Sequence, residues 1–131
     1  MLARYYGAID VATGAFDEKR AAVAEDWQTG DTDELIAAVL RLDDADEAAR
    51  FLRDLCTLGE IHDLAQRWAV VRLLDAGKHY AEISHETGAS TATITRIASW
   101  LRHGEGGYQE ALSRRKADRE AGMPYPTRAE A

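Results

Sequence analysis

The chain has 131 residues, of which 46% are hydrophobic and 30% are charged, and its formal net charge is −7. This length favours one domain with a modest core, no apolar run reaches the roughly 18 residues of a membrane span, and the first ten residues lack the pattern of a secretory signal. The acidic balance argues against a protein that binds nucleic acid through its overall charge.

The single cysteine and the four histidines indicate no redox or metal chemistry. Cys56 cannot form a disulfide within the chain. It lies in an apolar pattern, so we interpret it as a small core residue in a reducing compartment rather than as a nucleophile. The histidines form no arrangement typical of a metal site. We therefore expect a soluble cytoplasmic protein with no metal, no cofactor and no membrane partner.

Residues 1–30 show no dominant periodic face, and we treat them as an N-terminal extension of unknown role. The first ordered helix is predicted over residues 31–42, where Leu35, Val39 and Leu42 share one face. Asp31 or Thr32 is its expected N-cap.

Two capping-box spacings mark the next two helices. Asp44 and Glu47 open one of them, and Thr57 and Glu60 open the other, which should end at Gly77. The second of these helices has a broad apolar stripe, formed by Ile61, Leu64, Ala65, Trp68, Val71 and Leu74 with Val70 and Leu73 beside it. A helix apolar over most of its circumference must be covered on several sides. A second chain is the favoured cover, and a central helix in a monomeric bundle is the alternative.

Residues 79–104 have the pattern of a helix-turn-helix. The β-branched residues suggest a strand, but Ile94, Ile97, Ala98 and Leu101 fall at i, i+3, i+4 and i+7, which is the period of a buried helix face. A short helix over 80–87 places Ile83 inward, Gly88 accepts the conformation of a sharp turn, and Ser90 is a good N-cap. We expect Ile83, Gly88, Ile94 and Ile97 to form the core of the motif.

A last helix is predicted from about Gly107, burying Tyr108, Ala111 and Leu112. Its later part is polar all round. We therefore place the ordered domain at residues 31–116 and expect residues 117–131 to form a frayed polar tail.

The charge pattern favours a local nucleic-acid face around the second helix of the motif. Residues 31–60 contain nine acidic residues against three arginines, residues 88–104 contain no acidic residue, and a basic cluster follows at residues 114–116. This separation is compatible with a DNA-binding face on an acidic body. The alternative is that the threonines merely solvate a surface helix, although three threonines within five residues are unfavourable for a helix.

The expected DNA contacts fall into two groups. Small hydroxyl and methyl side chains at the start of the second helix could approach base edges in the major groove; these are Ser90, Thr91, Ala92 and Thr95. Basic and aromatic side chains around them could reach the phosphates; these are Lys78, Tyr80, Arg96, Arg102 and His103.

The segments "LGEIHDLAQRW", "LLDAGKHYAEIS" and "TGASTATITR" resemble the Trp repressor-like family, in particular its YerC/YecD group. The resemblance covers residues 33–112. It implies an all-α fold of about six helices with a helix-turn-helix, and an intertwined homodimer in which the N-terminal helices of each chain wrap around the other.

In the founding member of that family, tryptophan binds as corepressor between the central helix and the recognition helix. Thr93 and Arg96 match positions of that pocket. Ile97, however, stands where a glycine leaves room for the indole, Trp100 replaces a small hydroxyl residue, and Gln66 replaces the arginine that pairs with the ligand carboxylate. The resemblance therefore implies that these side chains fill the site from within and that free tryptophan is not a ligand.

We thus expect a homodimeric, sequence-specific regulator that binds double-stranded DNA without tryptophan. One alternative is a regulator switched by another small metabolite, bound beside Thr93 and Arg96. Another is a helix-turn-helix fold used only for protein association, which the net charge of −7 supports. An enzyme is disfavoured, because the possible pairs His62–Asp63 and His79–Glu82 come with no nucleophile, oxyanion donor or cofactor motif.

Overall fold

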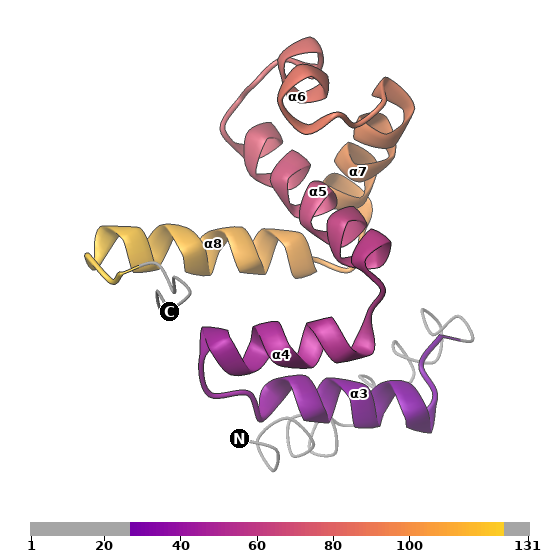
Figure 1. The fold of residues 1–131 in the computed structure, drawn as a ribbon. Coiled ribbons are helices and arrows are strands. Elements are labelled where there is room, and N and C mark those ends of the chain that lie inside the picture. The colour runs from indigo at the N-terminus through magenta and orange to yellow at the C-terminus, as the bar shows by residue number, and fades with distance from the viewer. Residues whose placement is uncertain (1–26, 125–131) are drawn as a thin grey trace, which may run out of the picture. The chain divides into compact units, whose positions relative to one another are not determined.

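The computed structural model describes residues 27–124, and these residues form six α-helices and no strand (Figure 1). The helices are α3 (Gly30–Leu40), α4 (Ala45–Leu55), α5 (Leu58–Asp75), α6 (Tyr80–Thr87), α7 (Thr91–His103) and α8 (Gly107–Glu120). The predicted all-α class is confirmed. None of these helices is long and apolar enough to cross a membrane. Most of the predicted N-terminal extension and the last seven residues of the predicted tail lie outside the described residues.

The backbone divides into two compact units, and the boundary between them falls within α4. In the first unit, α3 begins one turn earlier than a cap at Asp31 or Thr32 would place it. Thr29 is the N-cap, because its extended backbone lets its hydroxyl accept the Thr32 N–H at 3.2 Å while the Thr32 hydroxyl accepts the Thr29 N–H at 2.8 Å. The predicted N-cap was therefore wrong.

The predicted apolar face of α3 is not buried within the chain. Leu35 and Val39 are exposed, and Ala37 is the residue of α3 that the described part of the chain buries. Because Leu35 and Val39 are exposed, they leave apolar surface in contact with water, which favours association with another surface.

The caps of α4 and α5 follow from the sequence. At α4 the Asp44 carboxylate accepts the Glu47 N–H at 2.8 Å, but the Glu47 carboxylate accepts the N–H of Asp43 instead of that of Asp44. At α5 both bonds of the predicted capping box are present: the Glu60 N–H donates to the Thr57 hydroxyl at 3.1 Å, and the Thr57 N–H donates to the Glu60 carboxylate at 2.8 Å. These bonds satisfy backbone donors that no helical carbonyl can reach.

Helix α5 ends as predicted at Gly77, whose φ is +77°. The Gly77 N–H donates to the Leu74 carbonyl and the Lys78 N–H donates to the Leu73 carbonyl. This pair of bonds is a Schellman motif. It turns the chain sharply from α5 into α6.

The core of the second unit lies where α5, α6 and α7 come together (Figure 1). Its buried residues come from four helices and the turn between α6 and α7: Val70, Val71, Ile83, Ala89, Ile94, Ile97 and Leu112. Fully burying an aliphatic side chain of this size contributes about 1.5–3 kcal/mol. The three isoleucines therefore fix α6 and α7 against α5.

Four further residues differ in burial from what the sequence predicts. In the predicted α5 stripe, Leu64 is 47% exposed and Ala65 is exposed. Ala111 of α8 is exposed, and Cys56 is only partly buried and so is not a core residue. Helix periodicity gives the face that a residue occupies, but it does not say which neighbour covers that face. Helix α8 buries Leu112 and continues to Glu120, beyond the expected boundary at residue 116.

Candidate nucleic-acid interface

The turn between α6 and α7 is built around Gly88, which has a φ of +76°. This left-handed conformation costs other residues about 1–2 kcal/mol, and glycine avoids that cost. The Gly88 N–H donates to the Ser84 carbonyl at 2.9 Å. The Thr87 hydroxyl donates to the Ile83 carbonyl at 2.7 Å and accepts the Ala89 N–H at 3.1 Å. The turn is thus held by bonds on both sides of the glycine.

A long-range bond joins this turn to α5. The side-chain amide of Gln66 donates to the Thr87 carbonyl at 3.0 Å. The same nitrogen would lie 3.8 Å from a Cβ atom at Gly88. Gln66 therefore supports the exposed motif from the central helix.

Helix α7 begins at a side-chain cap, as predicted. The Ser90 hydroxyl accepts the Thr93 N–H at 3.2 Å and donates to the Thr93 hydroxyl at 3.0 Å. The first turn of α7 contains no acidic residue. The start of this 13-residue helix consequently keeps the partial positive charge of its unpaired N–H groups, which attracts phosphate.

Small side chains form the outward side of α7. Thr91, Ala92, Thr95 and Arg96 are exposed, whereas the opposite face buries Ile94, Ile97 and Ala98. The Thr95 hydroxyl donates to the Thr91 carbonyl at 2.9 Å. Sequence reasoning missed Ser99, which is exposed four residues after Thr95 on the same side; its i+4 spacing from Thr95 was the available signal.

The predicted phosphate contacts are distributed over the whole motif. Lys78 is exposed before α6, and Tyr80 is partly buried against the core. Arg102 and His103 are exposed at the opposite end of α7 from Thr91, roughly 16 Å away along the helix axis at 1.5 Å per residue. The structure therefore brings the hydroxyl side chains together and keeps these two basic residues apart from them. That separation exceeds the roughly 12 Å width of the major groove. The positions of Arg102 and His103 therefore suit contacts to phosphates beside the groove.

The positions that match the family's tryptophan pocket are occupied in different ways. Ile97 is 1% exposed, and the side chains of Gln66 and Thr93 are engaged in hydrogen bonds to Thr87 and Ser90. Trp100 is 48% exposed, so its indole does not fill an internal site in the single chain. Of the two side chains expected to fill the pocket, Ile97 is buried and Trp100 is exposed in the single chain.

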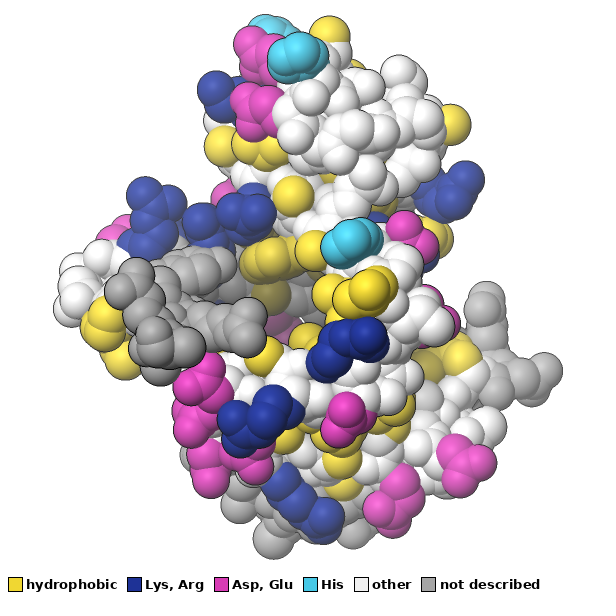
Figure 2. Space-filling view, viewed as in Figure 1, with side chains coloured by type: hydrophobic (Ala, Val, Ile, Leu, Met, Phe, Trp, Pro, Cys, Tyr) yellow, Lys and Arg dark blue, Asp and Glu magenta, His cyan; other side chains and the backbone are white. Residues whose placement is uncertain are grey.

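Charged side chains are unevenly placed around the motif. Figure 2 shows a broad surface over α6 and α7 that is mostly white, the colour of uncharged polar side chains and backbone, with charged side chains towards its edges. Helix α6 carries the exposed acidic residues Glu82 and Glu86, whereas α7 carries Arg96, Arg102 and His103 and no acid. Within the motif, the positive charge is thus concentrated on α7.

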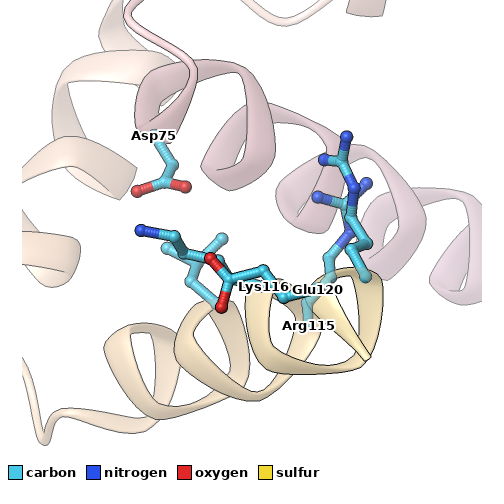
Figure 3. A pocket seen from close by; sticks show the side chains of 6 residues that line it. Asp75, Arg115, Lys116 and Glu120 are labelled. Atoms are coloured by element: carbon cyan, nitrogen blue, oxygen red, sulfur yellow. The ribbon is translucent and has the colours of Figure 1, made fainter. Parts of the chain in front are cut away.

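A separate groove lies between the end of α5 and α8. It has a volume of about 650 Å³ and is lined by Asp75, Leu112, Arg115, Lys116, Arg119 and Glu120. In Figure 3 the ammonium group of Lys116 points towards the carboxylate of Asp75. Its lining combines both signs of charge and includes none of the hydroxyl residues of α7.

Residues 27–124 contain no cluster of three or more histidine, cysteine or acidic side chains able to hold a metal ion. His62 and Asp63 are exposed. The Glu82 carboxylate accepts the His79 backbone N–H at 3.3 Å. The carboxylate thus has a structural partner at the start of α6.

Comparisons with known proteins agree with this architecture. Residues 30–116 match the model of the family described as Trp repressor protein. The chain is 49% identical over 84 residues to the uncharacterized protein YerC of Bacillus subtilis (strain 168), covering 64% of this chain and 81% of that protein.

Two solved structures resemble it. A candidate Trp repressor from Staphylococcus aureus has a TM-score of 0.66 and 40% sequence identity, covering 70% of this chain and 91% of its own. A TrpR-like protein from Eubacterium eligens ATCC 27750 has a TM-score of 0.63 and 37% identity, covering 76% of this chain and 97% of its own.

Proposed function

The chain belongs to the Trp repressor protein family, and we propose that it is a transcriptional regulator that binds double-stranded DNA sequence-specifically through α6 and α7. The observation that carries the proposal is the start of α7. There the first turn contains no acidic residue, and Thr91, Ala92 and, in the next turn, Thr95 are exposed to solvent. Gly88, Gln66 and Ser90 fix the backbone behind them. An α-helix whose N-terminal residues project in this way fits the major groove.

Binding in this proposal is local rather than driven by the whole molecule. The formal net charge is −7, so most of the surface repels DNA and the basic side chains of the motif must supply the attraction. Each phosphate that Lys78, Arg96 or Arg102 neutralises releases counterions, so the affinity should fall steeply as salt rises. An acidic body also disfavours binding away from the specific site.

The regulator acts as a homodimer. Support comes from apolar side chains that the single chain leaves in water, among them Leu58 at 56% and Leu64 at 47% exposure on α5. Two copies related by a two-fold axis would place their α7 helices in successive major grooves, with half-site centres roughly 34 Å apart. The operator should then be a palindrome.

Tryptophan is not the corepressor in this proposal. An indole ring needs an open space, but Ile97 is buried where the family's pocket requires room, and the polar groups of Gln66 and Thr93 already have partners.

Selection of bound duplexes from a random-sequence DNA pool, followed by sequencing, tests the proposal. The purified wild-type protein is compared with a triple variant, Thr91→Ala, Thr95→Ala and Arg102→Ala, whose folding is checked by circular dichroism. A matched control carries Ser113→Ala and Arg119→Ala, which remove a hydroxyl and one positive charge from exposed positions on α8.

We expect the wild type and the control to enrich one palindromic motif and the triple variant to lose it. If no motif is enriched even at low salt, and the protein associates only with itself, the chain is a protein-association module and the proposal is wrong. If a motif appears only when a cell extract of small molecules is added, the regulator depends on an effector.

A further inference from the structure

The outward side of α7 presents methyl groups and hydroxyl oxygens, and two hydroxyl hydrogens near its start already donate within the helix. The hydroxyl of Ser90 donates to Thr93, and the hydroxyl of Thr95 donates to the Thr91 carbonyl. Thr95 is exposed, and because its Oγ1 is turned back onto the preceding helical turn, the Cγ2 methyl is the part of its side chain without a hydrogen-bonding role. Ala92, also exposed, adds a second methyl group one turn earlier.

Long donor side chains are scarce on this side of α7. Guanine is read in the major groove by donors that reach its O6 and N7 atoms, most often an arginine or lysine. Residues 90–95 contain no arginine, lysine, asparagine or glutamine. Arg96 is the first long donor of α7; it is exposed four residues after Ala92 on the same helix face, and its long side chain can extend to the phosphates that flank the groove.

An A·T pair offers what this surface can use. Thymine presents a C5 methyl group, which packs against apolar atoms, and adenine presents an N6 amino group, which donates to a hydroxyl oxygen. The committed hydroxyls of Ser90 and Thr95 can still accept such a bond, because each oxygen has two lone pairs.

We infer that the recognition helix reads thymine methyl groups and adenine amino groups through Ala92 and Thr95, so that each half-site has A·T pairs where the start of α7 lies. This inference rests on the proposed function and specifies its DNA substrate. Arg96 contributes affinity and little base preference.

The test uses the duplex enriched by the selection and its uracil analogue, in which each thymine of one half-site is replaced in turn. Uracil pairs as thymine does but lacks the C5 methyl group. At about 0.8 kcal/mol per buried methyl group, each contacted thymine should show a loss of affinity of about fourfold. Fluorescence anisotropy at fixed salt measures the loss.

Variants of Thr95 separate methyl contact from hydroxyl contact. Thr95→Ser removes only the methyl group and keeps the oxygen that bonds to Thr91. For this variant, replacing thymine by uracil at the position that Thr95 contacts should no longer lower the affinity. Thr57→Ser is the matched control: it removes the same methyl group at the exposed N-cap of α5 and should leave the uracil effect unchanged. Arg96→Ala should weaken binding to all sequences alike. It should also reduce the slope of log K against log salt concentration by about 1, as the loss of one phosphate contact does.

Each outcome decides the inference. A·T-rich half-sites with uracil effects that depend on Thr95 support it. An enriched motif with guanines opposite the start of α7, or one that tolerates uracil everywhere, overturns it and leaves the regulator function intact. A relaxed preference at a G·C pair in Arg96→Ala overturns it as well. Failure to enrich any motif would instead overturn the proposed function together with this inference.

Discussion

The side-chain amide of Gln66 donates a 3.0 Å hydrogen bond to the carbonyl of Thr87, 21 residues further along the chain. Thr87 is the last residue of α6. Because Gln66 lies in α5, this bond fixes the end of α6 directly against the central helix. The position of α7 relative to the core thus depends on a polar contact as well as on the packing of Ile83, Ile94 and Ile97.

Replacement of this amide should weaken the motif. Gln66→Ala removes the donor and leaves the partly buried Thr87 carbonyl without it, so we expect the free energy of unfolding to fall by about 1 kcal/mol and DNA affinity to fall as well. Urea denaturation and anisotropy measure the two quantities. Gln109→Ala is a control, since Gln109 donates a comparable bond to the Leu101 carbonyl outside the turn. Gln109→Ala should lower the free energy of unfolding but leave the DNA affinity of the folded protein unchanged. Equal DNA affinities for Gln66→Ala and wild type would refute the role of the bond.

The turn should tolerate no side chain at Gly88. Gly88→Ala forces alanine into a φ of +76°, which should lower the free energy of unfolding by about 1–2 kcal/mol. The strain comes from the backbone, because the new Cβ would meet its nearest atom, in Gln66, at an ordinary 3.8 Å. Gly107→Ala, at the start of α8 with an ordinary φ and open space around it, should be neutral or slightly stabilising. Thermal and urea denaturation of both variants provide the comparison; equal stabilities would show that the turn relaxes.

Free L-tryptophan should not alter DNA binding. Ile97 is buried where the family's pocket has room for the indole, and Gln66 replaces the arginine that pairs with the ligand carboxylate. We expect no heat of binding in calorimetry at millimolar tryptophan and an unchanged Kd for the selected duplex. A tenfold gain in DNA affinity on adding tryptophan would contradict the proposed independence of this ligand.

Self-association should depend on the leucines that α5 exposes. The wild type should sediment at about twice the chain mass of 14.5 kDa. Leu58→Glu combined with Leu64→Glu places two charges in the interface and should shift the protein to the monomer. Ala81→Glu introduces the same side chain at an exposed position of α6 and should remain dimeric. A monomeric wild type at micromolar concentration would rule out the dimer.

Features that depend on neighbouring residues could be predicted from the sequence. The capping box of Thr57 and Glu60, the glycine turn at Gly88 and the cap at Ser90 each join residues no more than four apart, so their spacing carries the whole signal. Helix α6 has the predicted bounds for the same reason. The cap at Thr29 was missed because its partner Thr32 is a hydroxyl residue, whereas the usual capping box has glutamate or glutamine there.

Features that depend on distant residues could not be predicted. No local pattern links Gln66 to Thr87, and alignment with the family suggested only a ligand position for Gln66. The exposure of Leu64, Ala111 and Trp100 also depends on what covers them. Periodicity identifies a helical face but not its neighbour, so the predicted burial of these side chains did not follow from spacing alone.

The most direct test of the central claim is the ratio of two dissociation constants at physiological salt, one for the selected duplex and one for a scrambled duplex of equal composition. For a specific regulator the wild-type protein should prefer the selected duplex by at least about 10³. The variant Thr91→Ala, Thr95→Ala and Arg102→Ala should lose most of this preference, and the control with Ser113→Ala and Arg119→Ala should keep it. A wild-type ratio near one, or a ratio that the triple variant retains, would contradict sequence-specific binding through α7.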